Sequence, residues 1–177
     1  MYYPIVNTGI TLSEIPGKTA LFIEIGRCKQ GCKGCHSPYL SNGYFTLMPL
    51  EDCLLLVKRE LEEYPDINAI LLMGGTNNEG VTLESLKKLI EEMYMDTGIP
   101  VGLYSGRPSE NLKQLAEWFG LCWLKVGNYV EALGGLECKT TNQRLYEKDI
   151  TYTLNSHKEV VVHHGWRDIT HKFWKDR

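Results

Sequence analysis

Short apolar runs alternate along the chain with longer segments in which apolar residues recur at helical spacing. Runs of about four to eight apolar residues are typical of buried strands, particularly where glycine or proline bounds them. This pattern predicts buried strands over residues 19–25, 67–73, 100–104 and 121–126.

Three other segments place apolar residues three and four positions apart. This spacing predicts amphipathic helices over residues 50–64, 82–98 and 109–119. Thr82 and Ser109 are suitable N-cap residues for the second and third helices, because a hydroxyl oxygen accepts a hydrogen bond from a free backbone N–H. Pro65, Gly98 and Gly120 stand where the helices should end.

Strands that alternate with helices of this length indicate βαβ units and a parallel sheet. A closed eight-stranded barrel normally takes about 250 residues, and this chain has 177. We therefore expect an α/β fold, a partial (βα) barrel with mostly parallel strands, over residues 1–150. Apolar and polar residues alternate again from Thr151 onward. Residues 151–177 are expected to form a C-terminal extension with one or two edge strands, packed on the same domain.

Composition narrows the class of protein. The net charge is −3, and hydrophobic and charged residues make up 43% and 23% of the chain, as in an ordinary globular protein. This balance gives no electrostatic reason to expect a nucleic acid or an anionic membrane as a partner. No apolar stretch is long enough to cross a bilayer, and the first residues lack the pattern of a signal peptide. We therefore expect a cytoplasmic protein, whose six cysteines are metal ligands or core residues rather than disulfides.

Three cysteines, Cys28, Cys32 and Cys35, follow the first predicted strand at the spacing C-x3-C-x2-C. Gly31 and Gly34 lie between them, and glycine lets the backbone wrap tightly around a compact group. A [4Fe–4S] cluster needs a terminal ligand on each of its irons. Three thiolates leave one iron open, and an open iron can chelate a small molecule through nitrogen and oxygen.

Other interpretations of the cysteines stay open at the level of the sequence. A structural zinc ion needs a fourth ligand, for which His36, Cys53 or a histidine of the C-terminal extension is available. A disulfide framework is unusual in a cytosolic protein, and a chance group of core cysteines is disfavoured because Lys29 and Lys33 make the loop polar. Cys53 and Cys122 lie on a helix stripe and a strand, which predicts core thiols.

The C-x3-C-x2-C motif after the first strand of a βα array resembles the signature of the radical S-adenosylmethionine (SAM) enzymes, over about residues 15–146. Within that superfamily the chain is most similar to the activating proteins of the anaerobic (class III) ribonucleotide reductase. The similar features are the small size, Pro16-Gly17 before the first predicted strand, the Gly34-Cys35-His36 end of the cysteine motif and the run TNQRL at 141–145.

The resemblance implies how the cysteine motif binds its cofactors. Cys28, Cys32 and Cys35 match the ligands of one [4Fe–4S] cluster. Gly34, Cys35 and His36 match the stretch that lies beside the adenine of SAM. The fold implied is a partial barrel of the radical SAM type.

The resemblance also implies contacts to SAM after the next two predicted strands. Gly74 and Gly75 match a glycine pair whose backbone approaches the methionine part of SAM, and Ser105 matches a Thr/Ser position near SAM. Independently of the resemblance, the cysteines, these residues and the segment 127–129 each follow the carboxyl end of a predicted parallel strand. Ligands of such sheets bind at that edge, so the polar residues converge where a site is expected.

Two positions depart from the pattern of the family. The family usually has an acidic residue directly after the glycine pair, where it accepts a hydrogen bond from the SAM ammonium, whereas this chain has Thr76. We place Thr76 among the SAM contacts, although a hydroxyl carries no charge. The sequence leaves open whether the acidic contact is replaced by one of the next residues, Asn77, Asn78 or Glu79. The residue before the first cysteine is usually glycine and is Arg27 here.

The activity implied by the resemblance is reductive cleavage of SAM to methionine and a 5′-deoxyadenosyl radical. That radical would take a hydrogen atom from one glycine of the large subunit of the anaerobic ribonucleoside-triphosphate reductase, and a small reductant such as flavodoxin would supply the electron. Two other classes stay open. One is another radical SAM enzyme, which activates a different glycyl radical enzyme or acts on a small molecule as 7-carboxy-7-deazaguanine synthase does. The other is a non-catalytic iron–sulfur or zinc module.

Overall fold

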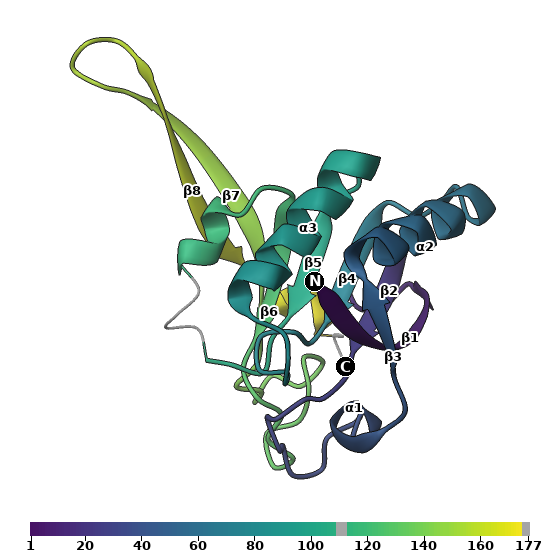
Figure 1. Ribbon diagram of the computed structural model, residues 1–177. Helices are drawn as coiled ribbons and strands as arrows, with labels where there is room; N and C mark the ends of the chain where they lie inside the picture. The colour runs from purple at the N-terminus through teal and green to yellow at the C-terminus, as the bar shows by residue number, and fades with distance from the viewer. Residues whose placement is uncertain (109–112, 175–177) are drawn as a thin grey trace.

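The computed structural model describes residues 1–108 and 113–174. The described residues form one open, eight-stranded sheet with the strand order β3-β1-β2-β4-β5-β6-β7-β8 (Figure 1). The strands are β1 (Tyr2–Thr11), β2 (Ala20–Ile25), β3 (Thr46–Pro49), β4 (Ala69–Met73), β5 (Val101–Tyr104), β6 (Leu121–Val126), β7 (Arg144–Leu154) and β8 (Val160–Asp168). The helical segments are α1 (Tyr39–Asn42), α2 (Leu50–Glu63), α3 (Leu83–Thr97) and the 3-10 helices η2 (Lys113–Glu117) and η3 (Thr170–Phe173).

The centre of the sheet is parallel and matches the sequence pattern. β2, β4, β5 and β6 are neighbours that run in the same direction, with nearly the bounds predicted for the four buried strands. α2 and α3 coincide with two of the predicted helices. The Thr82 hydroxyl caps α3 by accepting a hydrogen bond from the Ser85 N–H, and Gly98 ends the helix at φ 71°. The described part of the third predicted helix is the short η2, and its predicted N-cap, Ser109, lies outside the described residues.

The α/β class is confirmed, but the prediction of mostly parallel strands is wrong. Within the described residues β1 pairs antiparallel with both β2 and β3, and β7 pairs antiparallel with both β6 and β8. Pro4 and Gly9 interrupt the apolar pattern of the first residues, so pattern alone does not predict β1. In the fold Gly9 lies opposite Phe22 of β2, where a Cβ would come within 2.9 Å of the Phe22 ring. β1 is therefore specified by its contacts with β2.

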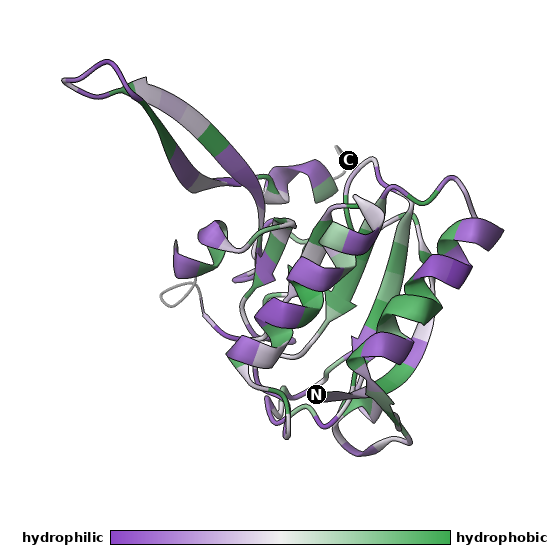
Figure 2. Cartoon of the chain, turned by 45° about the horizontal axis from the view of Figure 1, so that its top comes forward, coloured by the Kyte–Doolittle hydropathy of each residue, from purple (hydrophilic) through white to green (hydrophobic). Residues whose placement is uncertain are grey.

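The two faces of the sheet carry separate hydrophobic cores. α2 and α3 cover one face, where Leu21, Ile23 and Ile25 of β2 pack with buried residues of the helices. Figure 2 shows hydrophilic residues along the outer side of both helices. The other face carries Leu71 and Trp123 and is covered by loops and η3 instead of long helices. Loops leave room for a cavity at the carboxyl edge of the parallel strands on this second face.

β7 and β8 form a long hairpin that projects from the body of the sheet (Figure 1). Only residues 144–147 of β7 pair with β6, and the rest of β7 pairs with β8 alone. The edge strands predicted for the C-terminal extension are confirmed, with β8 at the sheet edge. The predicted domain boundary at residue 150 falls within β7, and the division itself stays a prediction.

Candidate functional site

A cavity of about 610 Å³, the large cavity, lies at the carboxyl edge of the parallel strands. Its floor comes from the ends of three strands: Met73 of β4, Tyr104 of β5 and Lys125 of β6. A volume of this size suits a small organic ligand. Most of its wall comes from three regions that are remote in the sequence: the cysteine loop (residues 26–38), the loop after β6 (residues 127–143) and the C-terminal segment (residues 169–174).

The cysteine loop starts directly after β2 and is attached to the fold at its first residues. The Cys28 N–H donates to a carbonyl of α1 at 2.9 Å, and the Lys29 N–H donates to the Asn77 carbonyl at 2.9 Å. Arg27 has φ 58°, a conformation that glycine adopts without strain and other residues adopt at a cost. The Arg27 guanidinium lies 4.5 Å from the centre of the Phe45 ring, and this cation–π contact offsets part of that cost.

Cys28, Cys32 and Cys35 are half-buried, and none forms a disulfide. The Ser37 N–H points at the Cys35 sulfur at 3.4 Å, a contact of the kind that stabilises a thiolate ligand. Among the described residues, no three His, Cys, Asp or Glu side chains are arranged to hold a metal ion. The donor set, three free thiols on one polar and glycine-containing loop, fits an iron–sulfur cluster in its chemistry. Cluster binding requires the three thiols to converge.

Cys53 and Cys122 are packed thiols, as predicted. Cys53 lies on the buried side of α2 and is 2% exposed, its thiol faces the Met48 carbonyl at 3.9 Å, and burial raises its pKa to about 12. Cys122 is half-buried and packs against the core of the second face, where burial also raises its pKa. Because metals bind the thiolate, a thiol with a raised pKa is a poor ligand, which disfavours Cys53 as the fourth ligand of a zinc ion.

Of the residues predicted to lie beside the adenine of SAM, Cys35 and His36 line the large cavity. The His36 ring lies 4.5 Å from the Tyr129 ring, centre to centre, with the two planes tilted by 50°. Gly34 has φ 71° and lies next to Glu131, whose carboxyl carbon would be 3.2 Å from a Cβ at this position. The end of the cysteine loop therefore packs closely on the loop after β6.

The glycine loop (residues 74–80) follows β4 and is fixed by one buried amide. Asn78 Oδ1 accepts a hydrogen bond from the Gly75 N–H at 2.7 Å. Asn78 Nδ2 donates to the carbonyls of Ile25 and Gly26 at 2.8 and 2.7 Å. Asn78 therefore ties the glycine loop to the end of β2, and both hydrogens of its amide group are donated to backbone carbonyls.

Gly74 and Gly75 adopt φ angles of 101° and 100°, which other residues rarely adopt. A Cβ on Gly75 would lie 2.8 Å from a methyl group of Leu86 on α3, so the missing side chain lets the loop pack closely on the helix. Neither glycine lines the large cavity. The packing of these two residues accounts for glycine at both positions.

Thr76 and Ser105 lie together, and neither lines the large cavity. Their hydroxyl oxygens are 2.8 Å apart and buried, and Ser105 Oγ also accepts a hydrogen bond from the Arg107 N–H at 3.0 Å. Thr76 and the next three residues of the glycine loop line a smaller pocket of about 270 Å³. There Glu79 forms an ion pair with Lys29 at 2.6 Å, and Lys29 holds the pKa of the Glu79 carboxyl below its ordinary value.

Two buried charged side chains near the carboxyl ends of the parallel strands, Glu24 of β2 and Lys125 of β6, were not predicted from the sequence. Glu24 is buried, its Oε1 accepts a hydrogen bond from the Tyr39 hydroxyl at 2.6 Å, and its Oε2 has no hydrogen-bond partner among the described residues. Burial lowers the pKa of Lys125 to about 8, an effect that the nearby thiols of Cys32 and Cys35 partly oppose. Glu24 and Lys125 are each the single charged residue of an otherwise apolar strand. A charge within an apolar run is the sequence signal that could have identified them.

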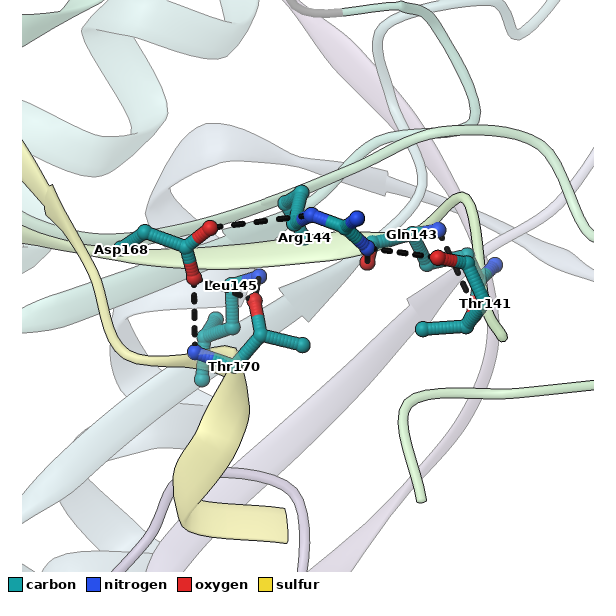
Figure 3. Close-up of polar contacts among 6 residues, drawn as sticks. All are labelled: Thr141, Gln143, Arg144, Leu145, Asp168 and Thr170. Atoms are coloured by element: carbon teal, nitrogen blue, oxygen red, sulfur yellow. Dashed lines mark hydrogen bonds and ion pairs between the residues drawn. The ribbon is translucent and has the colours of Figure 1, made fainter. Parts of the chain in front are cut away.

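The TNQRL run is joined by polar contacts to Asp168 of β8 and Thr170 of η3 (Figure 3). The Arg144 guanidinium donates to the carbonyls of Thr141 and Gln143 at 2.6 and 2.7 Å. It also lies 3.7 Å from one carboxylate oxygen of Asp168. The other oxygen of Asp168 accepts hydrogen bonds from the N–H and the hydroxyl of Thr170, at 2.8 and 2.6 Å. The motif thus has a structural role between β7, β8 and η3.

The same network places the C-terminal segment in the wall of the large cavity. The Leu145 N–H donates to the Thr170 hydroxyl at 2.9 Å, which attaches η3 to β7. Lys172, Phe173 and Trp174 follow and line the cavity. The buried Trp174 indole N–H has no hydrogen-bond partner among the described residues. The extension whose role the sequence left open therefore contributes aromatic and charged groups to the site.

Comparison of the chain with protein-family models, with curated proteins and with solved structures found no match. None of the helices within the described ranges combines the length and the apolar character that crossing a membrane requires.

Proposed function

We propose that this protein is a radical SAM activase, an iron–sulfur enzyme that reductively cleaves SAM and generates a glycyl radical on the large subunit of the anaerobic ribonucleoside-triphosphate reductase. One observation carries the proposal. Three free, half-buried thiols, Cys28, Cys32 and Cys35, share one loop at the carboxyl edge of the parallel strands, beside a cavity of about 610 Å³. A redox cofactor at this edge would adjoin the place where such a sheet binds its ligand.

Cys28, Cys32 and Cys35 would hold a [4Fe–4S] cluster, which when bound supplies one electron to the sulfonium group of SAM. The Ser37 N–H donates to the Cys35 sulfur at 3.4 Å and would remain in contact with it beside a cluster. Lys125 lines the large cavity and lies near the thiols of Cys32 and Cys35. Its ammonium group would offset part of the negative charge that three thiolates bring to the site.

The large cavity offers groups that suit SAM. His36 and Tyr129 present neighbouring aromatic rings, which suit a purine. The volume of about 610 Å³ lies within the usual range for small-molecule sites, whereas the pocket beside Thr76 has about 270 Å³. SAM in the large cavity would meet Cys35 and His36 directly. Contact with Thr76 or Ser105 would require the hydrogen bond between their hydroxyls to open.

We also propose that the fold is a partial barrel of the radical SAM type. The sheet is open, and an open sheet leaves a route by which a loop of another protein can approach a site at its edge, which a closed barrel does not. The proposed protein substrate is the glycine-bearing part of the large reductase subunit. The proposed electron donor is a small reductant such as flavodoxin, in the cytoplasm.

The test starts with anoxic reconstitution of the protein with iron and sulfide. We expect about four of each per chain and, on addition of dithionite and SAM, formation of 5′-deoxyadenosine. Cys32→Ala should lose both the iron–sulfur content and the formation of 5′-deoxyadenosine, because it removes one thiolate of the motif. The matched control is Cys122→Ala, a thiol on β6 outside the cysteine loop, which should keep both.

The partner is tested by adding the large reductase subunit to the same mixture. A doublet radical signal on that subunit is the expected result by electron paramagnetic resonance. Cleavage of SAM without this signal would favour another radical SAM activity, on a different protein or on a small molecule. One zinc ion per chain, or a complete cluster that never yields 5′-deoxyadenosine, contradicts the proposal.

A further inference from the structure

The projecting part of the β7–β8 hairpin has two different faces. Successive residues of a strand point to opposite faces, and residues paired in register share a face. One face is mostly polar, and on it the Thr153 hydroxyl and the His163 ring form a hydrogen bond at 2.7 Å. The other, which we call the apolar face, consists of three pairs: Ile150 with His164, Tyr152 with Val162, and Leu154 with Val160. The apolar face carries no Asp, Glu, Lys or Arg.

The apolar face continues a row of residues that begins in the hydrophobic core. Nearer the body, Tyr146 and Trp166 belong to this row and pack against the core beneath α2 and α3. Farther out, five apolar side chains of the row have exposed fractions between 44% and 68%: Ile150, Tyr152, Leu154, Val160 and Val162. Soluble monomers rarely expose a contiguous apolar surface of this kind, and a two-stranded ribbon alone is only marginally stable in water. The apolar face therefore calls for a partner that covers it.

The hairpin leaves the sheet at the edge opposite to the large cavity. Arg144 at the start of β7 pairs with Val126, the last residue of β6, and Glu147 pairs with Trp123 near the first residue of β6. β7 therefore runs towards the amino edge of the parallel strands and continues beyond it. In Figure 1 the turn of the hairpin and α1, which follows the cysteine loop, lie at opposite ends of the molecule. A partner on the apolar face would thus leave the large cavity uncovered.

Area and charge both suit a second copy of this chain as the partner. Each of the five apolar side chains leaves on the order of 100 Å² exposed, so the apolar face offers about 500 Å². Two such faces would together bury about 1,000 Å², which is near the smallest area that specific protein–protein interfaces bury. Residues 144–168 contain four Lys or Arg and four Asp or Glu residues, so the net charge of the hairpin is 4 − 4 = 0. Two hairpins therefore meet without net repulsion.

We propose that the chain forms a twofold-symmetric dimer in which the apolar faces of two β7–β8 hairpins pack against each other. A twofold axis brings the same surface of both subunits together, so an uncharged apolar face meets an identical one. The two ribbons pack as two layers of sheet do, with Tyr152 near the middle of the interface. Both large cavities stay open, because the hairpins leave their sheets at the other edge. The dimer does not depend on the proposed function.

Sedimentation equilibrium of the full chain tests the dimer. The wild type should approach twice the mass of the chain at a concentration of about 50 μM, as expected for an interface of modest area. Tyr152→Lys places a charge in the middle of the apolar face, where the dimer would bury it without a partner. We expect this variant to raise the dissociation constant of the dimer at least about 10-fold.

Thr151→Lys is the matched control, because it adds the same charge to the neighbouring residue of the same strand, on the polar face. It should dimerise as the wild type does. The proposal is overturned if the wild type stays monomeric at about 50 μM, if Tyr152→Lys dimerises as tightly as the wild type, or if the two variants weaken the dimer equally. None of these measurements needs the cluster, so a protein that never cleaves SAM contradicts the proposed function and leaves the dimer untouched.

A second measurement needs no variant and therefore does not depend on whether Tyr152→Lys folds. It follows amide hydrogen exchange of the wild type at low and at high protein concentration. The amides of residues 150–154 and 160–164 should exchange about 10-fold more slowly at the concentration at which the dimer forms. Exchange that is independent of concentration overturns the proposal. Protection of these residues only when the large reductase subunit is added would assign the apolar face to that subunit and would also overturn it.

Discussion

The glycine loop and the cysteine loop adjoin each other at the carboxyl edge of the sheet, and they are held by different means. Asn78 fixes the glycine loop with three hydrogen bonds to backbone groups in buried surroundings. The middle of the cysteine loop is exposed: the Cys35 N–H donates to the Cys32 carbonyl at 3.3 Å, and nothing lies within 4 Å of the place where a Cβ of Gly31 would be. The protein itself shapes the first loop, whereas the second has room to adapt to the cluster that we propose its thiols bind.

The largest effect on stability is expected from Asn78→Ala. It leaves the Gly75 N–H and the carbonyls of Ile25 and Gly26 without their buried partner, so the free energy of unfolding should fall by about 4 kcal/mol. Urea denaturation of the metal-free protein measures this. Asn77→Ala is the control, because the Asn77 amide contacts only a side chain of the cysteine loop, and it should cost less than about 1 kcal/mol. Equal losses in the two variants would show that the glycine loop is not fixed as described.

Gly75→Ala should lower the free energy of unfolding by about 3 kcal/mol. Its Cβ would meet Leu86 at 2.8 Å in a backbone conformation with φ 100°, so steric overlap adds to backbone strain. Gly31→Ala has φ 64° but open space around the new methyl group, and should cost about 1 kcal/mol from strain alone. Urea denaturation compares the two variants. A larger fall in the free energy of unfolding for Gly31→Ala than for Gly75→Ala would show that the cysteine loop, and not the glycine loop, is the more tightly packed.

Lys125→Met tests the cost of a buried charge near the cysteine loop, through the pH dependence of the free energy of unfolding. Burial lowers the pKa of Lys125 from 10.5 to about 8, so between these pH values the unfolded chain holds a proton that the folded protein lacks. Stability contributed by this group therefore rises with pH through that window, and below about pH 8 the folded protein carries the full cost of the buried charge. The variant should be more stable by about 2 kcal/mol at pH 7, with the gain disappearing towards pH 10. A gain that is constant with pH would mean that the ammonium is well solvated.

The smallest effect on stability is expected from Cys32→Ala in the metal-free protein. The half-buried thiol lies in the open part of the loop, so its removal should change the free energy of unfolding by less than about 0.5 kcal/mol. Iron binding after reconstitution should nevertheless be lost. A large destabilisation of the metal-free variant would instead show that Cys32 has a packing role. It would contradict the description of the cysteine loop as the more open of the two.

The sequence predicted the parts of the molecule whose signals are local. β4 and β6 are apolar runs, and α3 has a stripe of apolar residues between Thr82 and Gly98, so burial and capping are visible within a few residues. β1 and the direction of β7 were not predictable in this way. The need for glycine at position 9 is explained only by the Phe22 ring on the neighbouring strand. The residues of a single strand do not indicate whether its partner is parallel or antiparallel.

The candidate site shows the same distinction between features that are local in the sequence and features that depend on distant residues. The spacing of Cys28, Cys32 and Cys35 placed three thiols on one loop at the edge of the sheet, because a motif on one short loop can be identified without the fold; the cluster that it predicts stays a prediction. The residues expected to contact SAM were predicted from single positions, and the structure separates them: Cys35 and His36 line the large cavity, Thr76 lines the smaller pocket, and the others line neither. Which pocket a loop residue faces depends on hydrogen bonds to distant residues, such as the one between Thr76 and Ser105.

By itself, the sequence determined the order of strands and helices in the centre of the sheet and the three thiols at its edge. Both follow from contacts among residues close together in the chain, where periodicity and spacing carry the information. Only the tertiary structure decided that Glu24 is a buried carboxylate with an unused oxygen, and that Trp174 closes a cavity whose floor contains Lys125. These facts arise when strands far apart in the chain pair in register, because burial and the hydrogen-bond partners of a side chain are properties of the assembled sheet.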